Sequence, residues 1–164
     1  MASVSGLSAS HRAHARKLIA EDASRCYARR HVIHYTQGGA RWQGISSRRS
    51  AVRNTYPNYA DCSSLATWLI WDGIARSYGV RDVVNGAWWR YGYTGSMYRR
   101  GKAVTKLSSI KIGDLVFYGG GRGIPTHVAI CLGGRRVLSH GSESGPLILD
   151  IDYRGDRRMI RRYI

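Results

Sequence analysis

The sequence predicts an α+β fold, in which helices from the N-terminal half pack on a small antiparallel sheet from the C-terminal half. The two halves differ in the pattern of their apolar residues. The first half holds stretches with apolar residues at helical spacing, whereas glycine and proline divide the second half into short apolar runs. Helices followed by a run of strands are typical of α+β proteins. A chain of 164 residues can bury a hydrophobic core, and we expect one domain over residues 1–164.

Two helices are predicted in the first half. The first covers residues 8–30, where a serine near the start can cap the backbone and alanine, leucine and isoleucine form an apolar stripe. Cys26 falls in the last turn of this helix. The second helix is expected to begin at Asp61 or Cys62 and to end near Gly73.

The second half is predicted to form consecutive antiparallel strands. The apolar runs that carry this prediction are "GDLVFYGG", "THVAICLGG", "RRVLSHGS", "PLILDID" and the closing "RRMIRRYI". The closing run is expected to be an edge strand. Residues 35–50 are rich in Gly, Ser and Arg and are expected to form a loop, and residues 79–105 an irregular surface segment with some buried aromatic side chains.

The chain is strongly basic, with 26 Lys and Arg against 10 Asp and Glu and a formal net charge of +16. Such a charge favours polyanionic surroundings, which are nucleic acid, an acidic membrane face or an anionic cell envelope. The arginines within residues 157–162 are expected to be exposed. The start of the chain lacks the apolar core of a secretory signal, and no run of about 18 apolar residues occurs. We therefore expect a soluble chain, made in the cytoplasm and not inserted into a membrane.

The cysteines argue against a disulfide scaffold or a thiolate metal site. Cys26, Cys62 and Cys131 cannot all pair within one chain, and no C-x-x-C spacing occurs. His31 and His34 have no acidic residue or cysteine nearby, so this pair does not indicate a metal site either. We expect neither a metal nor a cofactor.

Cys62 stands where a helix begins, in "YADCSSLATWLIWDGI" (residues 59–74). The first turn of a helix has unpaired N–H groups and the positive end of the helix dipole, and both favour a thiolate. Such positions can lower the pKa of a cysteine from about 8.5 to about 3.5–7.5. Asp61 or Ser63 can cap the helix and hold this geometry. The alternative is a structural cysteine that packs as a small hydrophobic side chain.

Two histidines are candidates for the base that a catalytic cysteine needs. His127 opens one predicted strand and His140 ends the next. A two-residue turn at residues 133–134 would pair His127 directly with His140, which places both rings on one face of the sheet. One imidazole could then take the thiol proton while the other orients it. A longer loop would break this pairing, and the alternative is that both histidines are solvated surface residues.

The segment over residues 79–105 gathers aromatic and basic side chains. They are Trp88, Trp89, Tyr91, Tyr93, Arg90, Arg99 and Arg100. Such side chains can stack on the bases of single-stranded nucleic acid or on sugar rings, or they can simply pack in the core.

Four motifs in order resemble the NlpC-like papain-fold peptidases of bacterial cell walls. They are "DCSSLATWLI", "GDLVFYGG", "THVAICLGG" and "VLSHGS", and the resemblance covers about residues 33–150. The family opens a helix with D-C-S-G-L, continues with G-D-L-V-F-F and places its base in H-V-G-I-Y-x-G. The resemblance implies a papain-like fold, with Cys62 as nucleophile, His127 as base and His140 as the orienting residue.

The resemblance also implies substrate-binding residues. Tyr35 in "YTQGG" is similar to the tyrosine of the family's Y-x-W-G-G motif near the oxyanion site, although Gln37 replaces the usual tryptophan. Asp61 and Ser63 are implied to help bind the stem peptide of the substrate. Ser64 stands where the family usually has glycine.

The function that the resemblance implies is hydrolysis of an amide bond in the stem peptide of peptidoglycan. We expect a monomeric cysteine endopeptidase, either a phage endolysin or a virion-associated tail lysin. It would be made in the cytoplasm of the bacterial host and act at the cell wall. Its positive charge would hold it on the anionic wall, and no nucleic acid is expected as a partner. The alternatives are a papain-like thiol amidase or acyltransferase with another substrate, and a basic nucleic-acid-binding module.

Overall fold

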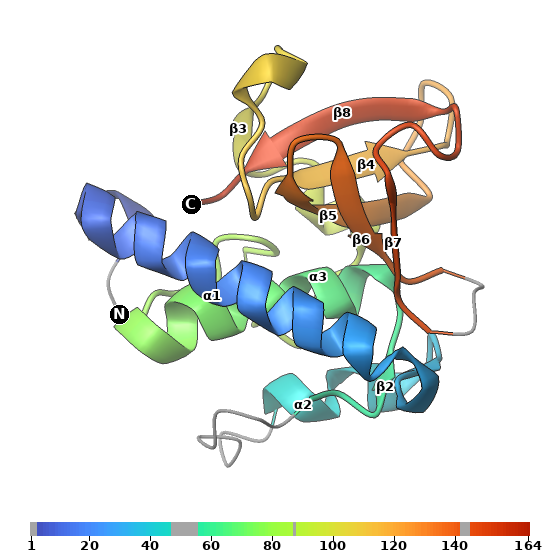
Figure 1. Ribbon diagram of the computed structural model, residues 1–164, viewed down its shortest axis with the longest axis horizontal. Helices are drawn as coiled ribbons and strands as arrows, with labels where there is room; N and C mark the ends of the chain where they lie inside the picture. Colours follow the sequence, from blue (N-terminus) through green and yellow to red (C-terminus); the bar gives the residue numbers. More distant parts are fainter. Residues whose placement is uncertain (1–2, 47–55, 87, 142–144) are drawn as a thin grey trace.

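The computed structural model describes residues 3–46, 56–86, 88–141 and 145–164 (Figure 1). The helices are α1 (Ala9–Ala28), α2 (Gln43–Ser46), α3 (Cys62–Ile70) and α4 (Thr94–Met97), and a π-helical turn, Trp71–Arg76, continues α3. The strands are β1 (His34–Tyr35), β2 (Tyr59–Ala60), β3 (Lys102–Ala103), β4 (Leu115–Tyr118), β5 (His127–Gly133), β6 (Arg136–Ser139), β7 (Leu147–Asp150) and β8 (Arg157–Arg162). Helices from the first half pack on a sheet from the second, so the α+β prediction is confirmed.

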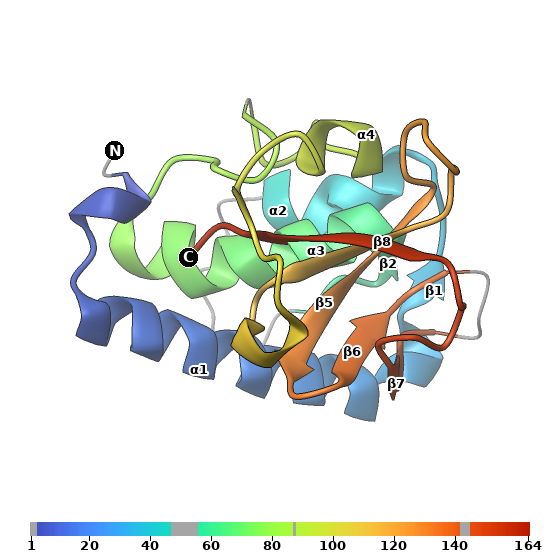
Figure 2. The same cartoon turned by 90° about the horizontal axis from the view of Figure 1, so that it is seen from above.

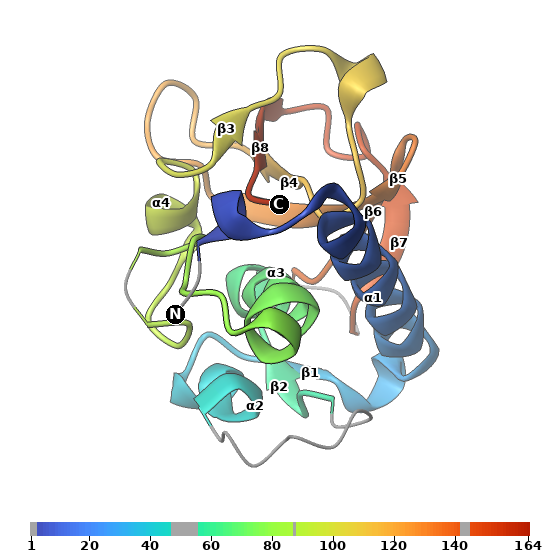
Figure 3. The ribbon, with the colours of Figure 1, turned by 90° about the vertical axis from the view of Figure 1, so that its left-hand side faces the viewer.

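Helix α3 lies at the centre of the molecule. Figure 3 shows the six-stranded sheet on one side of α3 and the small layer of β1, β2 and α2 on the other, with α1 alongside. The view from above gives the same arrangement, with α1 and α3 side by side (Figure 2). Because α3 is covered from several sides, every residue from Ser63 to Ile70 is buried. This explains why the sequence of α3 is almost continuously apolar rather than amphipathic.

Helix α1 matches the predicted helix over residues 8–30 to within two residues at each end. Ser8 caps it, because its hydroxyl accepts a hydrogen bond from the backbone N–H of His11 (3.1 Å). The predicted end of the second helix at Gly73 is too early, because the π-helical turn runs on to Arg76. A Cβ atom at Gly73 would lie 2.9 Å from Cγ1 of Ile19. Glycine therefore allows α1 to approach the extension of α3 closely.

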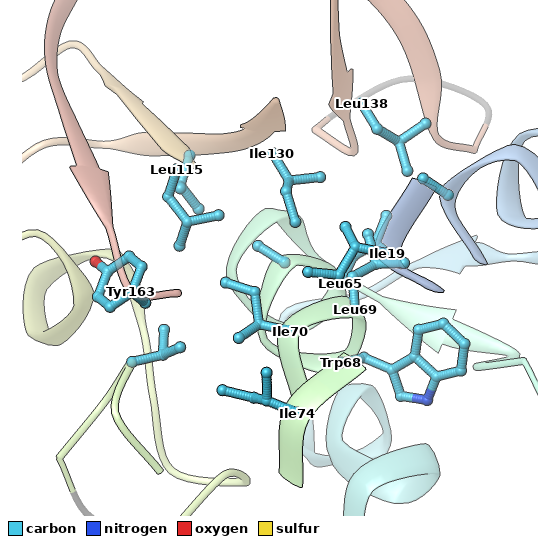
Figure 4. Packing of buried hydrophobic residues seen from close by; sticks show 14 of the residues in the cluster. Ile19, Leu65, Trp68, Leu69, Ile70, Ile74, Leu115, Ile130, Leu138 and Tyr163 are labelled. Carbon is cyan, nitrogen blue, oxygen red and sulfur yellow. The ribbon is translucent and has the colours of Figure 1, made fainter. Parts of the chain in front are cut away.

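The main core fills the space between the sheet and the helices. Figure 4 shows Ile19 of α1, Leu69 and Ile70 of α3, and Ile130 and Leu138 of the sheet pointing toward one another. A second, smaller cluster covers the opposite face of the sheet; its members are Val116, Tyr118, Ala129, Val137, Ile151 and Ile160. Alternate residues of each strand therefore enter different cores, as the twofold side-chain repeat of a strand requires.

The sheet is antiparallel throughout, in the order β3-β8-β4-β5-β6-β7. Strands β4 to β7 follow one another as predicted. The expectation that the closing run forms an edge strand is wrong, because β8 lies between β4 and the short strand β3. Lys102 and Ala103 of β3 pair with Arg162 and Arg161 of β8. Sequence pattern alone missed β3 because it is only two residues long and lies in the irregular segment.

Of the β8 arginines that were expected to be exposed, Arg157 is exposed, whereas Arg158, Arg161 and Arg162 are partly buried, and all four are hydrogen-bonded or ion-paired. Arg162 donates to both carboxylate oxygens of the fully buried Asp114 (2.8 and 2.7 Å). Arg161 donates to the carbonyl of Tyr98 (2.9 Å), and Arg158 to carbonyls of the loop between β4 and β5. Arg157 forms an ion pair with Asp152. These side chains thus hold β8 in the sheet.

The two predicted irregular segments contain short regular elements. Within residues 35–50, the structure shows a 3-10 turn, Gly39–Trp42, followed by α2; residues 47–50 lie outside the described part of the chain. Within residues 79–105 it shows α4 and β3. No helix among the described residues is long and apolar enough to cross a membrane.

Candidate active site

Cys62 is the first residue of α3 and is half-buried. The helix starts here because the Asp61 side chain accepts a hydrogen bond from the backbone N–H of Ser64 (2.7 Å), and the Ser64 hydroxyl accepts one from the backbone N–H of Asp61 (2.8 Å). This reciprocal pair is a capping box. The predicted start of the helix and its Asp61 cap are confirmed.

The sulfur of Cys62 is surrounded by hydrogen-bonding groups from three elements. The backbone N–H groups of Ser63 on α3 and Val128 on β5 interact with it, and Oγ1 of Thr94 on α4 lies 3.8 Å away. Sequence reasoning missed Thr94, because nothing in the irregular segment marks it as a neighbour of Cys62. The contact with Val128 brings the start of β5 to the cysteine, whereas the side chain of the preceding His127 pairs with Tyr118 on the opposite face of the sheet.

The electrostatic balance at Cys62 differs from the expectation. Burial raises the pKa of the Cys62 thiol, and the adjacent Asp61 carboxylate raises it further. Hydrogen bonds from Val128, Thr94 and Ser63 lower this pKa but do not reverse the shift. The expected lowering of the pKa by the helix N-terminus is therefore wrong, because the desolvation of the sulfur is larger.

His127 is buried at the start of β5, opposite Tyr118 of β4. Its Nε2 lies 2.9 Å from Oγ of Ser139 on β6. Ser139 Oγ in turn lies 2.9 Å from the hydroxyl of Tyr153. The imidazole is therefore held by a hydroxyl group rather than by a second imidazole.

His140 does not pair with His127. The turn falls at residues 134–135, and a bulge between Cys131 and Gly133 shifts the register, so that Ile130 faces Leu138. This register differs by one residue from the predicted one, and a one-residue shift moves side chains to the opposite face. His140 packs edge-on against Tyr35, with ring centroids 5.4 Å apart. The expected pair of histidines on one face is wrong, and Ser139 takes the place beside His127.

Tyr35 lies beside the segment that leads to Cys62. Strand β1 runs parallel to β2, which pairs Tyr35 with Ala60, two residues before the cysteine. The Tyr35 side chain is 37% exposed, and its hydroxyl accepts a hydrogen bond from the Gln37 amide (3.1 Å). The Gln37 that departs from the family motif therefore contacts the tyrosine of the same motif.

Asp61 and Ser63 are both buried and bonded within the cap. The Ser63 hydroxyl donates to Asp61 Oδ1 (3.0 Å), and Arg41 Nε lies 3.5 Å from the other carboxylate oxygen. These contacts position the first turn of α3. For both residues, the contacts seen in the structure are those of a structural role.

The aromatic segment before α4 is divided between core and surface. Trp89 is buried, whereas Trp88, Tyr91 and Tyr93 are each more than half exposed. Tyr93 directly precedes Thr94, the neighbour of Cys62. The packing interpretation therefore holds for Trp89 alone, and the exposed rings lie on a segment that ends at the candidate site. Among the described residues, no three His, Cys, Asp or Glu side chains are arranged to hold a metal ion.

Comparisons with known proteins identify the family. The sequence model of the NlpC/P60 family matches residues 39–153 of this chain. Among solved structures, RipB of Mycobacterium tuberculosis, a peptidoglycan hydrolase, is 28% identical, with a TM-score of 0.55 over 93% of this chain and 68% of that one. The NlpC/p60 domain of the peptidoglycan hydrolase SagA is 20% identical, with a TM-score of 0.58 over 90% of this chain and 97% of that one.

NlpC2 of Trichomonas vaginalis is 15% identical, with a TM-score of 0.60. The match covers 92% of this chain and 48% of NlpC2. The chain thus spans about half the length of that protein, and 44% of the related NlpC1. A comparison with curated proteins gives no match. The structural neighbours establish a papain-like α+β fold. Since the family match covers more than half of the chain, the chain belongs to the NlpC/P60 family.

Proposed function

We propose that the protein is a peptidoglycan hydrolase that acts as a cysteine endopeptidase on an amide bond of the stem peptide. The observation that carries this proposal is the junction of α3 and β5. There the Cys62 sulfur meets the backbone N–H of Val128, and the adjacent His127 is held through Nε2 by Ser139. The family membership and the peptidoglycan hydrolases among its structural neighbours support the same reaction.

The first step is proton transfer coupled to attack. His127, whose ring has to turn toward α3 for this step, takes the proton from the Cys62 thiol as the sulfur forms a bond to the carbonyl carbon, and the C=O electron pair moves onto oxygen. Because burial raises the pKa of Cys62, the thiolate forms during the attack rather than before it. The backbone N–H of Cys62, with the Tyr35 hydroxyl, stabilises the oxyanion.

The second step breaks the amide bond. The imidazolium of His127 gives its proton to the leaving nitrogen as the C–N bond breaks, which releases an amine and leaves a thioester on Cys62. Water, deprotonated by His127, then attacks the thioester and releases the carboxylate and the Cys62 thiol. Asp61 and Ser63 serve by fixing the turn that holds Cys62.

Replacement of the nucleophile tests this proposal. Cys62→Ala should abolish the clearing of a suspension of purified sacculi while the circular dichroism spectrum stays that of the wild type. The controls are Cys26→Ser and Cys131→Ser, which change buried free cysteines outside the site and should retain most of the activity. Clearing by Cys62→Ala at the wild-type rate would exclude this mechanism.

We further propose that the enzyme works as a monomer in phage-mediated lysis, as an endolysin or a virion-associated lysin made in the host cytoplasm. The net charge of +16 supports attachment to an anionic wall. Exposed charges are screened over about 10 Å at 0.1 M salt, so added salt should slow the hydrolysis of sacculi far more than that of a soluble stem peptide. Charge reversal at the exposed Lys106 and Arg122 should reproduce the effect of salt. Equal salt sensitivity on both substrates would remove the wall-binding role.

A further inference from the structure

Three exposed aromatic rings lie just before α4 and lead directly to the candidate active site. Trp88, Tyr91 and Tyr93 are 52%, 60% and 52% exposed, although side chains of this size usually lie mostly inside a protein. Tyr93 is followed by Thr94, whose Oγ1 lies 3.8 Å from the sulfur of Cys62. Several exposed apolar side chains beside a candidate site indicate a surface that binds a ligand.

A tight turn brings Trp88 and Tyr91 together. The N–H of Tyr91 donates to the carbonyl of Trp88 (3.0 Å), which is the bond between the first and fourth residues of a β-turn. In such a turn these two Cα atoms lie less than about 7 Å apart. Between them, Trp89 is buried in the main core, whereas Arg90 is exposed, with its guanidinium 5.1 Å from the centre of the Tyr91 ring. The turn is therefore anchored by one ring and presents two others to the solvent.

The chain is also held on either side of this turn. The Asp82 carboxylate accepts hydrogen bonds from the backbone N–H groups of Val84 (3.0 Å) and Asn85 (2.9 Å). The buried Asn85 side chain packs directly on Gly92, where a Cβ atom would lie 1.6 Å from Asn85 Oδ1. This close approach requires glycine, and it lets Asn85 hold the chain just after the turn.

Tyr93 is held by the start of α4. Its backbone N–H donates to Oγ of Ser96 (3.1 Å). Its ring occupies the place that a side chain at Gly95 would take, because a Cβ atom there would lie 2.2 Å from Cε2 of Tyr93. Side chains that are already fixed lose little conformational entropy when a ligand stacks on them. The segment therefore presents its rings in a prearranged conformation.

The chemistry of the rings and of Arg90 fits a sugar. One face of a pyranose ring carries several C–H bonds, which pack on the electron-rich face of an aromatic ring. The hydroxyl and acetamido groups at the edge of the sugar accept hydrogen bonds, which the exposed guanidinium of Arg90 can donate. The stem peptide proposed to bind at Cys62 is attached to a strand of such sugars. A surface for them beside Cys62 would therefore hold the part of the substrate next to the peptide.

We propose that Trp88, Tyr91 and Tyr93, with Arg90, form a binding surface for the sugar rings of the glycan strand of peptidoglycan. This inference rests on the proposed function, because it assigns a second part of the same substrate. The aromatic rings stack on the sugars, and the stem peptide attached to them extends toward Cys62. The enzyme therefore prefers a stem peptide that is still attached to its sugars over the free peptide.

The first test compares two substrates, a soluble muropeptide that carries its disaccharide and the same stem peptide without it. Trp88→Ala and Tyr91→Ala should each raise KM for the muropeptide at least about fivefold, as the loss of one stacking contact with a nucleic-acid base does, and leave kcat unchanged. KM for the free stem peptide should not change. Tyr91→Phe keeps the ring and should behave as the wild type. Val32→Ala is the matched control, because Val32 is as exposed as Trp88 (52%) but lies before β1.

The second test measures binding without hydrolysis. Calorimetric titration of the wild type with an N-acetylglucosamine oligomer, which is uncharged and carries no peptide, should show binding that Trp88→Ala and Tyr91→Ala each weaken at least about fivefold. Because this sugar is uncharged, its binding should be the same at about 0.1 M and about 0.5 M salt. Attachment through the net positive charge of the chain would instead weaken as salt is added.

The two proposals fail in different ways. If the wild type cleaves both substrates with the same KM, and neither alanine variant changes that KM, the sugar-binding role is overturned and the proposed function stands. The sugar-binding role is also overturned if single-stranded oligothymidylate binds through these rings while the sugar oligomer does not, which would assign the surface to nucleic acid. If the wild type cleaves neither substrate, the proposed function fails, and the titration with the sugar oligomer still decides the role of the rings.

Discussion

The N-terminus of α3 and the β5–β6 hairpin both contribute to the candidate active site, but they are held by different kinds of interaction. The cap that starts α3 lies within four consecutive residues, from Asp61 to Ser64. The base on the hairpin is held by Ser139, which is 12 residues away, and through it by Tyr153, a further 14 residues away. The position of the nucleophile is therefore set locally, whereas the orientation of the base depends on the register of the sheet.

The cap and the hairpin should therefore respond differently to substitution. A cap can be weakened without moving any distant residue, so its loss should lower the stability of the fold more than the activity. A register shift of one residue exchanges Ser139 and His140 between the two faces of the sheet, so it should lower the activity more than the stability of the fold.

The largest effect is expected at the base. His127→Gln removes proton transfer to and from the substrate, so kcat should fall by about 100- to 10,000-fold. His140→Gln, one residue from Ser139 but on the other face, should cost far less. Steady-state hydrolysis of a soluble stem peptide measures both. A larger loss in His140→Gln than in His127→Gln would contradict His127 as the base and would point to His140, which shares its face of the sheet with Leu138 and α3.

The next effect concerns the charge of the cap. Asparagine caps helices as well as aspartate does, so Asp61→Asn should preserve α3 while removing the negative charge that raises the pKa of Cys62. The thiolate fraction below that pKa should rise about tenfold for each unit by which the pKa falls. The rate of Cys62 alkylation by iodoacetamide at pH 7, followed by mass spectrometry, should therefore increase. A slower reaction would mean that Asp61 acts by another route.

Two variants compare the stability that the Asp61 cap contributes with the stability that depends on the bulge at Gly133. Asp61→Ala should lose about 0.5–2 kcal/mol of cap energy, or about 2–4 °C in Tm for each kcal/mol. Gly133 has φ +107° at the bulge, so Gly133→Ala should cost about 1–3 kcal/mol through backbone strain. Calorimetry measures both, with Gly6→Ala as a control that introduces no close contact.

Activity corrected for the folded fraction then separates the two variants. It should fall more in Gly133→Ala than in Asp61→Ala, because only the first perturbs the register that places Ser139 beside His127. The reverse order would contradict the division into a local cap and a register-dependent base.

The smallest effect expected is on stability at alkaline pH. Burial raises the pKa of Tyr118, beside the hairpin, and of Cys62, so the folded chain keeps protons that the unfolded chain releases. Since the unfolded state then binds fewer protons, the free energy of unfolding should fall as pH rises above about 9–10. Urea unfolding at increasing pH measures this slope, and Tyr118→Phe should reduce it. A slope unchanged in Tyr118→Phe would exclude Tyr118 as a cause.

The sequence was most informative where structure depends on near neighbours. The start of α3 at Cys62 with its Asp61 cap, the span of α1 and the β4–β7 succession all follow from local patterns. The register of β5 and β6 does not, because it depends on a bulge between Cys131 and Gly133 that no pattern marks. Thr94 reaches Cys62, and Tyr153 reaches Ser139, only through tertiary packing. The raised pKa of Cys62 likewise reflects burial in the folded chain.

Mass spectrometry of the muropeptides released from purified sacculi shows which bond the protein cleaves and whether Cys62 is needed. With the wild type, we expect fragments in which a stem-peptide amide has been replaced by a free amine and a free carboxylate, and none of these from Cys62→Ala. Cys26→Ser should give the same fragments as the wild type. Identical fragments from Cys62→Ala, or release of intact stem peptides only, would contradict a cysteine endopeptidase built on Cys62 and His127.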